Sequence, residues 1–230
     1  MPKAPNIVLV HGAWANGSSW SKVIPLLLAK GFNVAAAHNP LSSPTDDVAS
    51  TTRLVNAQVG PVLLVGHSYG GYVITEVGNN PKVVGMVYVA AFGPDTGETL
   101  ATTAKDFAPA PVVSELQPIA DGYLLLSPKG VTEDFVQDLP DNEKNTYVSL
   151  QAPTSASIFG TPITNAAWHT KPSWYAVAAN DRTINPDYER FAAKRMGATT
   201  ITVEASHVAM LAQSQAIADL IIQAATKLST

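Results

Sequence analysis

The chain has 230 residues, of which 46% are hydrophobic and 14% are charged, and its formal net charge at pH 7 is −4. This composition is typical of one compact domain with a large core, and it argues against a disordered chain. The acidic balance and the lack of a Lys/Arg cluster among aromatic residues argue against nucleic acid as a partner. No apolar run approaches the roughly 18 residues of a membrane span, so no membrane insertion is expected.

The sequence contains no cysteine, which excludes disulfides, thiolate metal sites and a cysteine nucleophile. This fits a reducing compartment. The N-terminal residues run directly into an apolar segment that begins at Asn6, leaving no room for a signal peptide. We therefore expect a cytoplasmic protein.

Strand-like and helix-like segments alternate through the first 90 residues. The expected strands are Ile7–Val10, Val34–Ala37, Val62–Val65 and Val84–Ala90. The expected helices are Trp20–Lys30, capped by Ser19 and closed by Gly31, then Thr45–Ala57, then Gly70–Gly78. Because parallel neighbours need crossover connections, this alternation predicts a mainly parallel sheet.

From Phe92 to about Thr170 the alternation breaks, and prolines and short apolar clusters such as Tyr123–Leu126 take its place. We expect residues 93–170 to form a helical cap over the strand ends that excludes water and shapes a pocket. The alternative is a helical surface subdomain without substrate contact. Alternation then returns, with strands at Trp174–Ala179 and Thr199–Val203 and helices at Pro186–Met196 and Gln213–Lys227. The prediction is one α/β domain over residues 1–230, with about six strands flanked by helices.

The pentapeptide Gly66-His67-Ser68-Tyr69-Gly70 directly follows the apolar run Pro61–Val65. A G-x-S-x-G sequence between a strand and a helix forms a tight turn that projects the serine hydroxyl from the edge of a sheet. The pattern alone recurs by chance, but here the strand and the helix flank it in the required order. Ser68 is therefore the candidate nucleophile.

A serine hydroxyl is a weak nucleophile at neutral pH and needs a base. Among the five histidines, His207 follows the last strand and precedes the last helix, which places it at the same sheet edge as Ser68. It is the candidate base. Packing or loop support better explains the other four, which are His11, His38, His67 and His169.

The base in turn needs an acid that fixes its tautomer, and in this architecture the acid lies between the serine and the histidine in the chain. Asp181 fits because it follows the predicted strand Trp174–Ala179. Its chief rival is Asp95, which follows the strand Val84–Ala90. Asp187 is better explained as an acid in the first turn of a helix.

An oxyanion that develops at the substrate carbonyl needs two donors. The backbone N–H of Tyr69, directly after the nucleophile, is one candidate, and that of Ala13, in the loop after the first strand, is the other. Trp14 either lines the pocket or packs the first helix onto the sheet, whereas packing alone explains Trp20. Tyr123 and Trp168 are further candidates for the pocket wall.

These segments together resemble the α/β-hydrolase superfamily over nearly the whole chain, and in particular its small esterase and hydroxynitrile-lyase branch, which includes methyl-salicylate-type esterases. The resemblance rests on His11-Gly12-Ala13-Trp14, Gly66-His67-Ser68-Tyr69-Gly70-Gly71, Val87-Tyr88-Val89-Ala90-Ala91-Phe92, Asp181-Arg182-Thr183-Ile184 and Ser206-His207-Val208-Ala209-Met210-Leu211. It implies a triad of Ser68, His207 and Asp181, a helical cap, and no metal or organic cofactor. Lyases of this branch carry a lysine directly after the catalytic histidine; this chain has Val208 there, so it looks like the esterase version.

The sequence thus predicts hydrolysis of a small, mainly apolar carboxylic ester through an acyl-enzyme on Ser68. A ligand-binding or sensing protein on a hydrolase scaffold is the alternative from another class. Other reactions on the same triad are lactone or C–C hydrolysis, perhydrolysis and hydroxynitrile cleavage. The partner expected is a small ester molecule, and the sequence does not indicate an oligomeric state.

Overall fold

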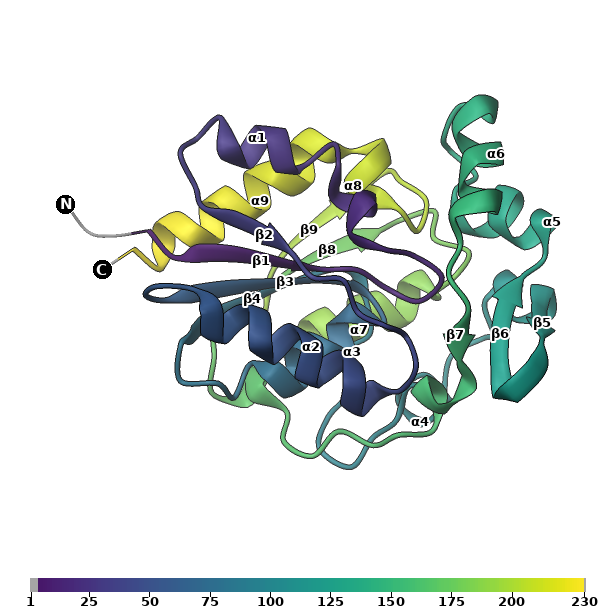
Figure 1. Ribbon diagram of the computed structural model, residues 1–230, viewed down its shortest axis with the longest axis horizontal. Helices are drawn as coiled ribbons and strands as arrows, with labels where there is room; N and C mark the ends of the chain where they lie inside the picture. Colours follow the sequence, from purple (N-terminus) through teal and green to yellow (C-terminus); the bar gives the residue numbers. More distant parts are fainter. Residues whose placement is uncertain (1–3, 230) are drawn as a thin grey trace.

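A twisted sheet of six parallel strands forms the centre of the computed structural model, which describes residues 4–229 (Figure 1). The strand order is β2-β1-β3-β4-β8-β9, and every neighbouring pair is parallel. The strands are β1 (Asn6–Val10), β2 (Val34–Ala36), β3 (Val62–Ser68), β4 (Val83–Ala91), β8 (Ser173–Ala178) and β9 (Thr199–Val203). The predicted α/β class and parallel sheet are confirmed.

Helices cover both faces of this sheet (Figure 1). On one face lie α1 (Ile24–Leu28), α8 (Ala209–Ala212) and α9 (Ser214–Lys227), and on the other lie α2 (Pro44–Ala57), α3 (Gly70–Val77) and α7 (Pro186–Arg195). Because both faces are covered, every residue of β1, β3 and β8 is buried. This explains why these strands are nearly continuous apolar runs in the sequence.

The helix predicted over Trp20–Lys30 is the main error in the α/β framework. The structure has a 3₁₀ turn at Gly17–Trp20 followed by the single short helix α1. Pro25 lies in the first turn of α1, where its missing N–H costs nothing, whereas in the middle of a longer helix it would break a hydrogen bond. Ser19, predicted as the cap of this helix, lies inside the 3₁₀ turn instead.

Residues 93–170, which we call the insertion, lie mostly beyond the carboxyl ends of the parallel strands, and their last part, which includes Ala167–His169, runs back along α3 to the start of β8 (Figure 1). Their helices are short: α4 (Leu100–Thr103), α5 (Pro128–Gly130) and α6 (Asp141–Leu150), accompanied by 3₁₀ turns and by one π-helical turn at Val131–Phe135. They also form an antiparallel sheet of β5 (Leu116–Pro118), β6 (Tyr123–Leu126) and β7 (Thr154–Ser155). The expectation of a purely helical segment is thus incomplete, because the apolar cluster at Tyr123–Leu126 pairs as a strand on both sides.

Candidate active site

Ser68 lies at the turn that ends β3 and precedes α3, and its φ is 56°. A non-glycine residue in this left-handed region is strained, so the surrounding packing must hold it there. The packing is close: a Cβ at Gly70 would lie 2.6 Å from the carbonyl oxygen of Val10. Because Gly70 has no side chain, α3 can start directly against β1, and Ser68 lies at the corner between β3 and α3.

His207 and Asp181 meet at the same edge of the sheet. Nδ1 of His207 lies 2.6 Å from Oδ2 of Asp181, and both side chains are fully buried. Asp181 is itself fixed, because its Oδ1 accepts hydrogen bonds from the backbone N–H groups of Thr183 (2.6 Å) and Ile184 (2.9 Å). The carboxylate therefore orients the imidazole and keeps its hydrogen on Nδ1.

This tautomer leaves the lone pair of the imidazole on Nε2. That atom is buried, and no residue in the described part of the chain is hydrogen-bonded to it. Ser68, the sequence candidate for its partner, makes no hydrogen bond with it in this structure. Bonds of this kind are often long before substrate binds and shorten in the reacting complex.

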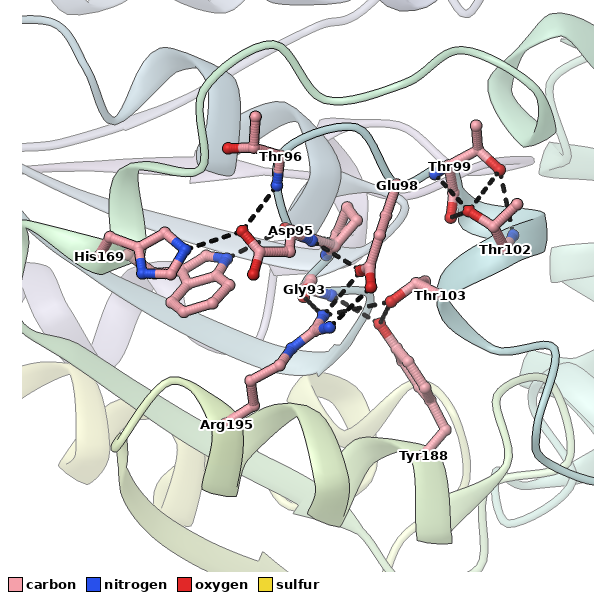
Figure 2. Close-up of polar contacts among 12 residues, drawn as sticks. Gly93, Asp95, Thr96, Glu98, Thr99, Thr102, Thr103, His169, Tyr188 and Arg195 are labelled. Carbon is pink, nitrogen blue, oxygen red and sulfur yellow. Dashed lines mark hydrogen bonds and ion pairs between the residues drawn. The ribbon is translucent and has the colours of Figure 1, made fainter.

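Asp95, the rival acid, belongs to a different cluster. Its Oδ1 lies 2.7 Å from Nε2 of His169, an exposed histidine of the insertion, as Figure 2 shows. The same oxygen accepts the backbone N–H of Thr96. Asp187 is exposed in the first turn of α7 and pairs with Arg190, three residues further on. Neither carboxylate contacts His207, so Asp181 alone of the three orients that ring.

Two further histidines are buried near the site and are structural. Burial lowers the pKa of His11 to about 4, and lowers that of His67 well below its ordinary value. His11 donates from Nδ1 to the Gly12 carbonyl and accepts the Asn39 N–H at Nε2, so both its nitrogens are used. Both rings stay neutral at physiological pH, in agreement with the packing role predicted for them.

The loop after β1 lies directly against Ser68. A Cβ on Gly12 would stand 2.6 Å from the Cβ of Ser68, which leaves no space for a larger residue. Trp14 adopts a φ of 55°, and its backbone N–H donates to the buried Oγ1 of Thr154 in β7, 2.9 Å away. The insertion thus holds this loop in a strained shape, with Ala13 beside Ser68.

A cavity of about 290 Å³ opens at Ser68. Ala13, Trp14 and Tyr69 line it together with Ser68. Most of the remaining wall is apolar, and the polar exceptions are Lys105, Thr183 and Asn185. The other apolar side chains include Phe92, Leu100, Phe107, Val112, Ile158 and Ile184.

The other two residues predicted for the pocket are not among those that line it. Trp168 is buried elsewhere: its Nε1 donates to the Pro94 carbonyl, and its ring packs at a tilt of 31° against that of His169. Tyr123 is half-buried in β6, where its strand pairs with β7. Both are large aromatics, whereas the wall is built mainly from residues in short helices and turns.

Several lining residues carried no signal in the sequence. Leu100, in α4, belongs to a four-residue helix that apolar periodicity cannot detect. Figure 2 shows what holds this helix: Arg195 of α7 pairs with Glu98 (2.9 Å) and donates to Oγ1 of Thr103 (3.2 Å). An ion pair between residues so distant in the chain is visible only in three dimensions.

Within residues 4–229, no group of three or more His, Asp and Glu side chains is placed to hold a metal ion. None of the helices in that range is long and apolar enough to cross a bilayer.

Comparisons with known proteins agree with this architecture. The chain is 27% identical to methylesterase 8 of Arabidopsis thaliana, over 97% of this chain and 90% of that protein. It is 26% identical to salicylic acid-binding protein 2 of Nicotiana tabacum, over 99% of each. The crystal structure of a pyrethroid hydrolase from Sphingobium faniae has the same fold, with a TM-score of 0.84 and 22% identity over 97% of this chain and 98% of that one. The model of the alpha/beta hydrolase family matches residues 7–220. These matches confirm the resemblance found in the sequence, and the chain belongs to the alpha/beta hydrolase family.

Proposed function

We propose that this protein is a serine esterase that hydrolyses small, mainly apolar carboxylic esters. The observation that carries the proposal is the buried 2.6 Å contact between His207 and Asp181, at the sheet edge where Ser68 lines a largely apolar cavity. Relatives named as esterases support it, including a carbendazim hydrolyzing esterase of Nocardioides that is 32% identical over 48% of this chain.

In the proposed mechanism, Nε2 of His207 takes the proton of the Ser68 hydroxyl as the oxygen attacks the ester carbonyl. The negative charge on the carbonyl oxygen is stabilised by the backbone N–H groups of Ala13 and Tyr69. Asp181 stabilises the imidazolium that forms. His207 then gives the proton to the leaving alkoxide, an acyl group remains on Ser68, and water activated by the same imidazole releases the acid.

The cavity suits an apolar ester because its wall offers few groups that could hydrogen-bond a polar one. Val208 follows His207 and is buried, so no cation stands there to hold a departing cyanide, which argues against lyase chemistry. A cytoplasmic location and the absence of nucleic acid partners stay predictions.

The test is turnover of a short-chain p-nitrophenyl ester by the wild type, Ser68→Ala and His207→Ala. We expect both substitutions to lower kcat by at least about 1000-fold, and intact mass spectrometry to detect an acyl adduct on the wild type but not on Ser68→Ala. His169→Ala is the matched control, since His169 also pairs with an aspartate but is exposed and does not line the cavity. Turnover that survives loss of Ser68 would refute the mechanism, and tight ligand binding without turnover would favour a sensing protein.

A further inference from the structure

A second carboxyl group is buried directly behind the His207–Asp181 pair. Glu189 lies on α7 and has no exposed surface. Its Oε2 accepts the backbone N–H of Ala178, the last residue of β8, at 2.9 Å. The backbone N–H of Asp181 donates to the carbonyl oxygen of the same Ala178 at 3.3 Å, so both acids stand at this one residue, and the Asp181 carboxyl is the neighbouring group that acts most strongly on Glu189. Two acidic side chains thus share one dry site, and one of them faces the imidazole.

The remaining oxygen of Glu189, Oε1, has no hydrogen-bond donor among the described residues. A buried carboxylate oxygen without a donor loses its hydration and gains nothing in return. The same oxygen is satisfied if it carries a hydrogen, because a carboxylic acid can donate to the Asp181 carboxylate. The geometry therefore favours one proton shared between the two side chains.

Burial and the charged groups around Glu189 also favour its neutral form. Burial first, and the charge of Asp181 second, raise the pKa of Glu189 well above its ordinary value. The titratable side chains that act on it are Tyr175 of β8, Asp181 of the loop after β8, and Arg190 of α7. Burial keeps Tyr175 a neutral phenol by raising its pKa. Arg190 is half-exposed and already paired with Asp187, so it does not neutralise a buried carboxylate.

We propose that Glu189 is a positioning residue that remains a neutral acid, donates a hydrogen bond from Oε1 to the Asp181 carboxylate, and so holds Asp181 against His207. The inference rests on the function proposed above, in which Asp181 orients the catalytic base. Two carboxylates this close cannot both ionise without strong repulsion. With Glu189 neutral, Asp181 carries the single negative charge that stabilises the imidazolium.

Two substitutions separate this role from plain packing. Glu189→Gln keeps both hydrogen bonds, because its amide donates to Asp181 while its carbonyl accepts from Ala178. Glu189→Met keeps the volume but loses both bonds. We expect Met to lower kcat about tenfold or more, and Gln to retain kcat within about threefold of the wild type. A Met variant as active as the Gln variant would reduce Glu189 to a packing residue and overturn the proposal.

The pH profile gives a second readout. The acidic limb of kcat/KM reports the ionisation of the free enzyme's base. If Glu189 is neutral, Glu189→Gln changes no charge, and the acidic limb stays where it is. If Glu189 were ionised, the same substitution would remove a negative charge beside the imidazole, and the limb would shift to lower pH. The shift would overturn the proposal.

A third measurement needs no catalysis, so it stands even if the esterase proposal fails. Difference infrared spectroscopy of the wild type against Glu189→Gln, at neutral and mildly alkaline pH, should show the carbonyl band of a protonated carboxylic acid that the variant lacks. A carboxylate band in its place would overturn the neutral state of Glu189. Failure of the esterase proposal appears separately, as hydrolysis that does not depend on Ser68.

Discussion

The imidazole Nε2 of His67 lies 2.9 Å from the backbone carbonyl oxygen of His207. A carbonyl can only accept, so Nε2 of His67 carries a hydrogen and donates it, and burial keeps this ring neutral. The two rings also pack together, with centroids 4.6 Å apart. This bond joins the turn that presents Ser68 to the loop that presents the candidate base, so the histidine inside the pentapeptide helps to position the one that follows the last strand.

His67→Leu should therefore loosen the His207 loop. It leaves a buried carbonyl without a donor, which typically costs about 1 to 3 kcal/mol of unfolding free energy. We expect that loss in denaturant unfolding, together with a lower kcat. His67→Gln is the matched variant, because its terminal amide can donate from nearly the same place. We expect it to retain most of the wild-type unfolding free energy and most of the wild-type kcat. Wild-type stability in the Leu variant would contradict the role given to this bond.

Asp181→Asn should impair the protein through the tautomer of His207. Oδ1 of Asp181 already accepts two backbone N–H groups, so an asparagine would keep its oxygen there and turn its NH₂ toward His207. Nδ1 would then have to accept, the hydrogen would move to Nε2, and Nε2 could no longer take a proton from Ser68. We expect kcat to fall by roughly 10⁴-fold with little change in KM.

Asp95→Asn serves as the control for that experiment. Asp95 also contacts a histidine at 2.7 Å, but this is the exposed His169. We expect kcat for ester hydrolysis to stay within about twofold of the wild type, since surface pairs contribute little. Equal losses of kcat in Asp95→Asn and Asp181→Asn would contradict the role of Asp181 in orienting His207.

Gly12→Ala should act on the site by steric contact alone. The added methyl group would lie 2.6 Å from the Cβ of Ser68 and 3.1 Å from its Oγ, so either the loop or the serine must move. Because a donor or nucleophile displaced from its place commonly costs about 100-fold or more in turnover, we expect a loss of that size in kcat. Gly160→Ala is the control, since a Cβ there meets nothing within 4 Å. A fully active Gly12→Ala variant would mean that the loop is not rigid.

The parallel sheet could be predicted because its strands are buried on both faces and read as unbroken apolar runs. Val62–Ser68 is an example: the prediction ended at Val65, three residues early, because the glycine and polar residues that follow do not look like a strand. The helix that contains α1 is predicted too long, over Trp20–Lys30, for the opposite reason. The residues that flank α1 are apolar enough for a helix, but Pro25 fixes where that helix begins.

The pairing of His207 with Asp181 could also be anticipated, because each residue follows a strand and parallel strands end at one edge of the sheet. The residues of the cavity wall could not be anticipated from the sequence. Leu100 reaches it only because Arg195 and Glu98 pair across a sequence separation of 97 residues (Figure 2). Such contacts leave no periodic trace in the sequence, so the sequence alone does not separate Trp14, which lines the wall, from Tyr123 and Trp168, which do not.

The last prediction concerns the carboxyl group that holds Tyr69, the residue after Ser68. Asp47 in α2 has no exposed surface; its Oδ2 accepts the Tyr69 hydroxyl and its Oδ1 the backbone N–H of Leu41, each at 2.8 Å. Burial, the largest cause, raises the pKa of Asp47 from 3.8 to about 6. The folded protein therefore holds this proton more tightly than the unfolded chain. The resulting stabilisation is complete below the ordinary pKa of 3.8 and is lost as the pH rises through about 6.

Asp47→Asn should remove this pH dependence. Two pKa units correspond to at most about 3 kcal/mol, so the unfolding free energy of the wild type should fall by up to that amount, relative to the variant, between about pH 4 and pH 7. Denaturant unfolding at a series of pH values measures it. Asp46→Asn is the control, because Asp46 is its exposed neighbour and hydrogen bonds from Ser42 and Ser43 lower its pKa, so it titrates below this window. Parallel pH profiles for the wild type and Asp47→Asn would show that Asp47 is ionised throughout, and that Tyr69 is held by a permanent charge.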